Sequence, residues 1–75
     1  MPTGGAGTTG PVSRVGARIR ALRVKRRLTQ SALAKKAGIS REYLTRLEAG
    51  RYDPKIGVVD RIAKALKTPI TALVR

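Results

Sequence analysis

The hydrophobic residues of the chain recur every three or four positions in short blocks, without the alternation of a strand. This spacing is typical of amphipathic helices and predicts an all-α fold of five helices. The first helix is expected over residues 14–27, where Val15, Ile19 and Leu22 share one face that the stem of Arg26 extends. Ser13 precedes this face as a candidate N-cap.

Two shorter helices follow, each between a capping residue and a glycine. Thr29 and Gly38 enclose residues 30–37, and Ser40 and Gly50 enclose residues 41–49. Ser and Thr side chains cap helix N-termini, whereas glycine takes the left-handed conformation that ends a helix. The sequence therefore predicts two helices joined by a turn of only three residues.

The remaining pattern predicts a turn over residues 51–54 and then two more helices. The helix over residues 56–66 has its apolar face at Val59, Ile62, Ala63 and Leu66. Thr68 and Pro69 have the form of an N-cap followed by proline at the first helical position. They predict a last short helix that buries Ile70 and Leu73.

The first thirteen residues differ in composition from the rest of the chain. They are rich in Gly, Thr and Pro and carry no charged side chain, which predicts a flexible tail, residues 1–13, ahead of one domain over residues 14–75. An N-terminal arm that enters the minor groove of DNA uses Arg or Lys, so that role is not expected here.

Charge and residue types narrow the possible functions. The chain has 17 Lys and Arg and a net charge of +13, which favours a polyanionic partner such as nucleic acid. Because Cys and His are absent, no disulfide, no metal site and no cofactor are expected, and no nucleophile–base pair can form an enzyme active site. No apolar run is long enough to cross a membrane. Two tyrosines without Phe or Trp offer no platform for single strands, which favours duplex DNA.

The segment over residues 30–47 carries the functional prediction. Two helices joined by three residues must cross steeply, which requires a small side chain such as Ala34 at the contact. The residues expected to face the core are Leu33, Ala37, Ile39, Leu44 and Leu47. The opposite face of the second helix has the size of a DNA major groove. It exposes Arg41, Glu42, Thr45 and Arg46.

These positions stand in the run LTQSALAKKAGISREYLTRLEAG, which resembles the helix-turn-helix of the Cro and phage-repressor-like (Xre-type) DNA-binding proteins. The matching features are Thr29-Gln30, Ala34, Gly38, Leu44, Leu47-Glu48, Gly50, Pro54 and residues 62–66. The resemblance covers residues 14–74. It implies sequence-specific binding of duplex DNA through the helix at residues 41–49, and a transcriptional regulator that acts as a repressor.

The resemblance also implies roles for single residues. Arg41, Glu42 and Arg46 match positions that read base edges, where Arg suits guanine and Glu suits the amino group of cytosine. Glu42 and Arg46 can equally form a surface ion pair, because they lie four residues apart. Thr45 is expected to touch a thymine methyl group or a phosphate. Gln30 matches a residue that binds a phosphate and braces the recognition helix; the alternative is an ordinary exposed helix residue.

The DNA backbone is expected to lie against the connection after the recognition helix and against helix N-termini, where backbone N–H groups attract phosphate. Besides Gln30, the residues expected to contact it are Ser40, Tyr43, Arg51, Tyr52 and Lys55. For Tyr43 the alternative is that the ring covers the edge of the core. Lys35 and Lys36 are expected to be solvated or to act only at long range.

Two further expectations concern stability. In the family, an Arg of the first helix pairs with a Glu at the end of the recognition helix, and the matching residues are Arg23 and Glu48. We expect a largely buried salt bridge, of which removing one partner would destabilise the fold by about 3–5 kcal/mol. Lys67 stands where family members often have Gly, so it must be left-handed unless the helix ends differently.

The expected protein is a cytoplasmic regulator of bacterial or phage origin, associated with the nucleoid when bound to DNA. We expect a homodimer on a palindromic operator, with recognition helices about 34 Å apart. Val58 and Val74 lie off the core face and are candidates for its dimer surface. The alternative is a protein-interaction module such as an antitoxin, because fold alone does not fix function. No toxin-binding appendage is evident in the sequence, which favours the regulator.

Overall fold

The structure is a computed structural model that describes residues 11–51 and 54–74. Within these residues the protein is all-helical, with the helices α2 (Pro11–Lys25), α3 (Gln30–Ala37), α4 (Arg41–Glu48), α5 (Ile56–Ala65) and α6 (Thr71–Val74). The predicted all-α fold of five helices is therefore confirmed.

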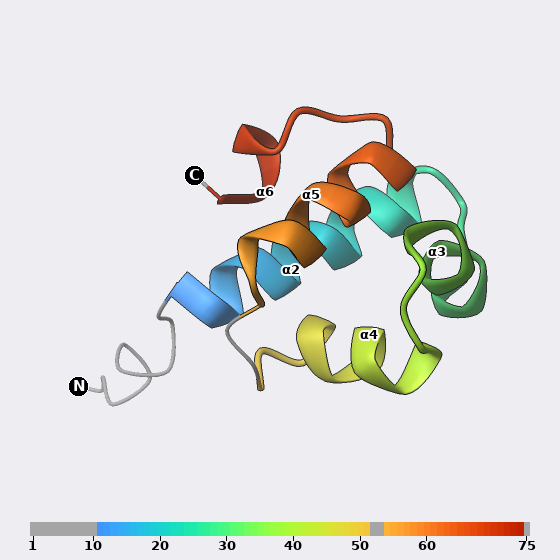
Figure 1. Cartoon of the computed structure of the whole chain (residues 1–75), viewed down its shortest axis with the longest axis horizontal. Helices are drawn as coiled ribbons and strands as arrows, with labels where there is room; N and C mark the ends of the chain where they lie inside the picture. The colour runs from blue at the N-terminus through green and yellow to red at the C-terminus, as the bar shows by residue number, and fades with distance from the viewer. Residues whose placement is uncertain (1–10, 52–53, 75) are drawn as a thin grey trace.

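The longest helix, α2, crosses the middle of the molecule, with α4 on one side of it and α6 on the other (Figure 1). α2 packs against α4 and α6, whereas α3 packs against α4 and α5. The core lies between these helices, and each of them contributes to it. Its buried residues are Ile19, Leu33, Ala34, Ala37, Leu44, Leu47, Val59, Ile62, Ala63, Leu66 and Leu73. The other predicted apolar positions, among them Val15, Leu22, Ile39 and Ile70, are partly buried against this core.

The N-terminal boundary of the domain differs from the prediction. α2 begins at Pro11, three residues early, so residues 11–13 belong to the helix and not to a tail. Ser13 lies inside α2, and its prediction as the N-cap is wrong. Proline suits the first turn of a helix because it has no backbone N–H to leave unsatisfied. The remainder of the predicted tail, residues 1–10, lies outside the described residues.

The C-terminal end of α2 lies two residues before its predicted position. The helix ends at Lys25, and Arg27 has a φ of 58°, in the left-handed region. The N–H of Leu28 donates to the Arg23 carbonyl at 3.0 Å and closes the helix end. The sequence does not signal this helix end, because the left-handed residue after a helix is usually glycine and here it is Arg27. The predicted packing of the Arg26 stem is wrong, since Arg26 is exposed.

α5 is followed by a lysine in the left-handed conformation, Lys67, as predicted from its position where family members often have Gly. Lys67 has a φ of 55°, and the N–H of Thr68 donates to the Ala63 carbonyl at 3.0 Å. Thr68 therefore closes α5 instead of opening the last helix. α6 begins only at Thr71, so the predicted cap at Thr68 and helix start at Pro69 are wrong.

Candidate nucleic-acid interface

Local contacts fix both ends of α4, the predicted recognition helix. The side-chain oxygen of Ser40 accepts a hydrogen bond from the Tyr43 N–H at 3.0 Å, which confirms the predicted N-cap. Glu42 stands in the first turn, where a carboxylate is stabilised by the positive end of the helix dipole. The helix ends at Glu48, one residue before the predicted end, and Gly50 follows with a φ of 75°.

The two faces of α4 differ sharply in exposure. Leu44 and Leu47 are 0% and 1% exposed, so they hold the helix against the core. The exposed residues of the opposite face are Arg41, Glu42, Thr45 and Arg46, as the sequence predicts. α4 thus presents a polar ridge with two arginines to the solvent.

The turn between α3 and α4 sets the direction of this ridge. Thr29 caps α3 by accepting a hydrogen bond from the Ala32 N–H at 3.0 Å, and Gly38 ends it with a φ of 72°. Both features agree with the sequence prediction. Ala34 is 2% exposed on the buried face of α3, the helix that packs directly against α4. A larger side chain at such a contact would push the two helices apart.

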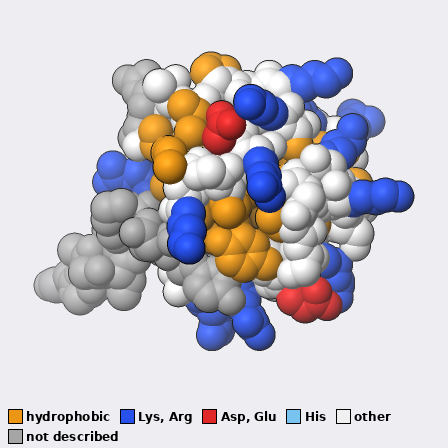
Figure 2. Space-filling view, in the orientation of Figure 1, with side chains coloured by type: hydrophobic (Ala, Val, Ile, Leu, Met, Phe, Trp, Pro, Cys, Tyr) orange, Lys and Arg blue, Asp and Glu red, His pale blue; other side chains and the backbone are white. Residues whose placement is uncertain are grey.

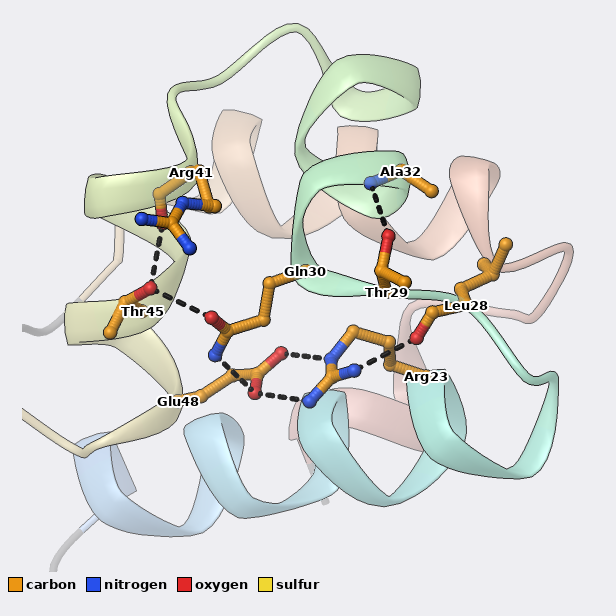
Figure 3. Close-up of polar contacts among 8 residues, drawn as sticks. All are labelled: Arg23, Leu28, Thr29, Gln30, Ala32, Arg41, Thr45 and Glu48. Atoms are coloured by element: carbon orange, nitrogen blue, oxygen red, sulfur yellow. Dashed lines mark hydrogen bonds and ion pairs between the residues drawn. The ribbon is translucent and has the colours of Figure 1, made fainter.

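The expected pair of Arg23 and Glu48 is present and joins α2 to the end of α4 (Figure 3). Arg23 Nε lies 2.7 Å from Glu48 Oε2, and Arg23 Nη2 lies 3.0 Å from Oε1, so the contact is bidentate. Nη1 of Arg23 donates to the Leu28 carbonyl at 2.8 Å. The side chains are 12% and 3% exposed, so water screens this pair little.

Gln30 links α3 to the recognition helix at two points (Figure 3). Its Nε2 donates to Glu48 Oε1 at 3.2 Å, and its Oε1 accepts from the Thr45 hydroxyl at 2.9 Å. The same hydroxyl lies 2.9 Å from the Arg41 carbonyl, so a single proton serves two acceptors. The bracing role that the resemblance implies for Gln30 therefore has a direct physical basis. Sequence analysis does not identify the partners Thr45 and Glu48, because they lie 15 and 18 residues away in the sequence.

Gly16 is a second residue that sequence analysis missed. A Cβ at this position would overlap the backbone oxygen of Leu47 and would lie 3.3 Å from the Glu48 Cα. The backbones of α2 and α4 can therefore approach closely only because residue 16 has no side chain. An isolated glycine inside a helical pattern is the signal that points to such a contact.

The predicted backbone contacts are distributed around α4. Arg51 and Lys55 are placed on the connection to α5, where Arg51 is exposed and Lys55 is the N-cap residue of α5. Tyr43 is partly buried and packs against the core, which is the alternative considered for its ring. Tyr52 lies outside the described residues.

The described residues contain no group of three or more His, Cys, Asp or Glu side chains that could hold a metal ion. Within residues 11–51 and 54–74, none of the helices has the length and apolar character needed to span a membrane.

Helix-turn-helix regulators are among the known proteins similar to this chain. A family model described as helix-turn-helix, HTH_3, matches residues 19–73. The immunity repressor protein of Bacillus phage phi105 is 45% identical over 60 residues, which make up 80% of this chain and 42% of the repressor. An uncharacterized HTH-type transcriptional regulator of Archaeoglobus fulgidus is 41% identical over 56 residues, 75% of this chain and 80% of that protein. This chain thus spans less than half of the phage repressor and most of the archaeal regulator.

Solved structures show the same likeness. The restriction-modification controller protein C.AhdI of Aeromonas hydrophila superposes with a TM-score of 0.80 at 29% sequence identity. The match covers 83% of this chain and 94% of that chain.

These three relatives are named as a repressor, a regulator and a controller protein, and they give no support to the alternative of an antitoxin. The family is one of regulatory domains and not of enzymes, in agreement with the sequence. The family match covers more than half of the residues and includes both α3 and α4. The chain belongs to the helix-turn-helix family HTH_3, the family of Cro- and phage-repressor-like domains that its sequence resembles.

Proposed function

We propose that the protein binds duplex DNA sequence-specifically, with α4 in the major groove, and regulates transcription as a repressor. The observation that carries this proposal is the division of α4 into a buried leucine face and an exposed face with Arg41 and Arg46. A helix held in this way presents its polar side chains to base edges without losing its contacts with the core. The net charge of +13 supplies the attraction to phosphate that such binding requires.

The base contacts follow from the chemistry of the exposed ridge. Arg41 and Arg46 have the donor geometry for guanine O6 and N7, and Glu42 can accept from the amino group of cytosine. Thr45 takes a narrower role, because its hydroxyl already bonds within the protein. Its methyl group is therefore the part that contacts DNA, and a thymine methyl is the matching group.

Hydrogen-bond capacity supports the proposed phosphate contacts. One of the two Nε2 protons of Gln30 goes to Glu48, which leaves the second for a phosphate oxygen. The hydroxyl of Ser40 accepts from the Tyr43 N–H and still has its own proton to donate. The proposed backbone contacts are Gln30, Ser40, Tyr43, Arg51, Tyr52 and Lys55. With about 6–10 phosphates engaged, affinity would fall by about 10³–10⁵ between 50 and 200 mM salt.

On DNA, the proposed assembly is a homodimer bound to a palindromic site. The proposed location is the cytoplasm, where the DNA is. Val74 is 45% exposed at the C-terminal end of α6, and Figure 2 shows hydrophobic side chains on the surface in this region. Val24 and Ile56 are exposed as well, at 54% and 67%, so exposure alone does not single out Val74 as the dimer contact. Val58, the other candidate, is already partly buried against the core.

Selection of bound sites from a random duplex library at stated salt tests the proposal. An enriched palindrome is expected, and a selected pool no tighter than random duplex would contradict the proposal. Arg46→Ala should relax the preference at one base position by about 1–3 kcal/mol, whereas Lys55→Ala should weaken binding to all sequences alike. Equal effects of both variants on every site would show that the division into base and backbone contacts is wrong.

A further inference from the structure

A second group of cations surrounds a hollow of about 460 Å³ between α3 and α5. Four basic side chains line this α3–α5 hollow, namely Lys35 and Lys36 from α3 and Arg61 and Lys64 from α5. Small residues complete the lining: Ala37, Gly38 and Ala65. Figure 2 shows Lys and Arg side chains gathered over the side of the molecule where α3 and the C-terminal end of α5 lie.

The α3–α5 hollow faces α5, although Gly38 at its edge stands only two residues before Ser40, a proposed phosphate contact. α3 packs against α4 on one side and against α5 on another, and the hollow is on the α5 side. Gln30 lies in the first turn of α3, whereas Lys35 and Lys36 lie in its last turn. Six residues of helix separate Gln30 from Lys36 by about 9 Å along the axis and about a third of a turn around it. The four cations therefore lie on another side of α3 than Gln30, the proposed phosphate contact of that helix.

The lining specifies the chemistry of the ligand. Among the described residues it contains no aromatic and no large apolar side chain, so it offers nothing to hold a base or an organic ring. Asp60 contacts Lys64 at 3.2 Å, but both side chains are exposed, and a surface pair of this kind is readily exchanged for another anion. The C-terminus of α3 carries a partial charge of about −0.5. The four positive charges of the lining outweigh it, so the hollow attracts anions.

From these observations we infer that the α3–α5 hollow is a second phosphate-binding site, which takes the backbone of a second DNA duplex while α4 holds the first. This inference goes beyond the proposed function, because it gives one domain two DNA-binding sides. A single free anion would gain little from solvated lysines, since salt screens each exposed contact. A duplex brings several phosphates at once and gains from the release of their counterions.

A bridging assay tests the inference with probes of random sequence, so its result does not depend on whether α4 selects a site. Protein is loaded on a short immobilised duplex, and capture of a labelled second duplex is measured. Four phosphate contacts predict that the affinity for the second duplex falls by about 150-fold between 50 and 200 mM salt, from a slope of about −3.6, when capture is divided by the amount of protein still on the immobilised duplex. The test variant replaces Lys35, Lys36, Arg61 and Lys64 with Gln. Its matched control replaces Arg14, Arg18, Arg20 and Lys25 of α2 with Gln, which removes the same charge elsewhere.

The test variant should stay on the immobilised duplex as well as the control does and should capture at least about tenfold less of the second duplex. Equal capture by both variants would overturn the inference. Bridging through a protein dimer would give this result, because the test variant would still form the dimer. Titration with inorganic tripolyphosphate gives a further arm, read from the backbone amide resonance of Gly38. A shift there without any capture of duplex would also overturn the inference and would assign the hollow to small polyphosphates. Failure of the proposed function would instead appear as loss of the site preference in the selection experiment.

Discussion

Gly16→Ala adds one methyl group where the backbone of α4 already lies. The new Cβ would overlap the Leu47 carbonyl oxygen, and it would lie 3.1 Å from the Leu47 carbonyl carbon and 3.3 Å from the Glu48 Cα. A clash with a flexible side chain can be relieved by rotation about a single bond. A clash with helix backbone can be relieved only if α2 and α4 move apart, and this movement would disturb the bidentate Arg23–Glu48 pair.

Two effects of opposite sign set the size of the change. Alanine is the better helix former by about 1 kcal/mol. An added methyl group in a filled core destabilises by about 1–3 kcal/mol, and a backbone obstacle places Gly16→Ala at the upper end of that range. The variant should therefore lose about 2 kcal/mol of unfolding free energy. For a domain of this size such a loss lowers the melting midpoint by about 8–16 °C.

Two other glycines provide matched controls for thermal and urea unfolding followed by circular dichroism. A Cβ at Gly57 would meet nothing within 4 Å, so Gly57→Ala should be neutral or stabilising by up to about 1 kcal/mol. A Cβ at Gly38 also meets open space, but its φ of +72° strains alanine, so Gly38→Ala should destabilise by about 1–2 kcal/mol. If Gly16→Ala proved as stable as Gly57→Ala, the close approach of α2 and α4 would not be what holds the two helices in place.

Three further substitutions address the charges and caps. Glu48→Ala should lower the unfolding free energy by about 3–5 kcal/mol, because Arg23 would keep its charge in a site where it is 12% exposed. Combining Glu48→Leu with Arg23→Met should restore much of that loss in urea unfolding, and no recovery would show that charge burial is not the cause. Thr29→Ala should destabilise by about 1 kcal/mol through loss of the α3 cap, and an unchanged urea midpoint would contradict that role. Lys67→Gly should stabilise by about 1 kcal/mol in the same assay, since its φ of 55° favours glycine, and a loss of stability would refute this strain.

Local chemistry explains which parts of the fold were predictable. Thr29 and Ser40 cap their helices because a hydroxyl three residues before a backbone N–H is enough to form the contact. Leu44 and Leu47 are assigned to the core by spacing alone, and the face opposite them is exposed as a consequence. These features depend on residues close together in the sequence.

Most features that the sequence did not predict depend on residues that only the packed helices bring together. The hydrogen bonds of Gln30 to Thr45 and Glu48 join different helices, and no spacing rule reaches across them. Arg27 at a left-handed helix end was missed for another reason, because the backbone there takes a conformation that arginine does not favour. The α3–α5 hollow likewise requires two helices far apart in sequence to lie side by side.

The contacts of α4 indicate how a helix of eight residues is held in one orientation. Leu44 and Leu47 lie on one face of α4, and their apolar contacts oppose rotation and sliding of the helix less than directional bonds do. Glu48 opposes both movements, because its two oxygens accept two hydrogen bonds from Arg23 of α2 and one from Gln30 of α3. Directional, charge-assisted bonds fix rotation in a way that apolar contacts do not. The direction in which α4 presents its arginines therefore depends on α2 and α3, so changes in α2, which carries none of the proposed DNA contacts, should alter DNA sequence preference.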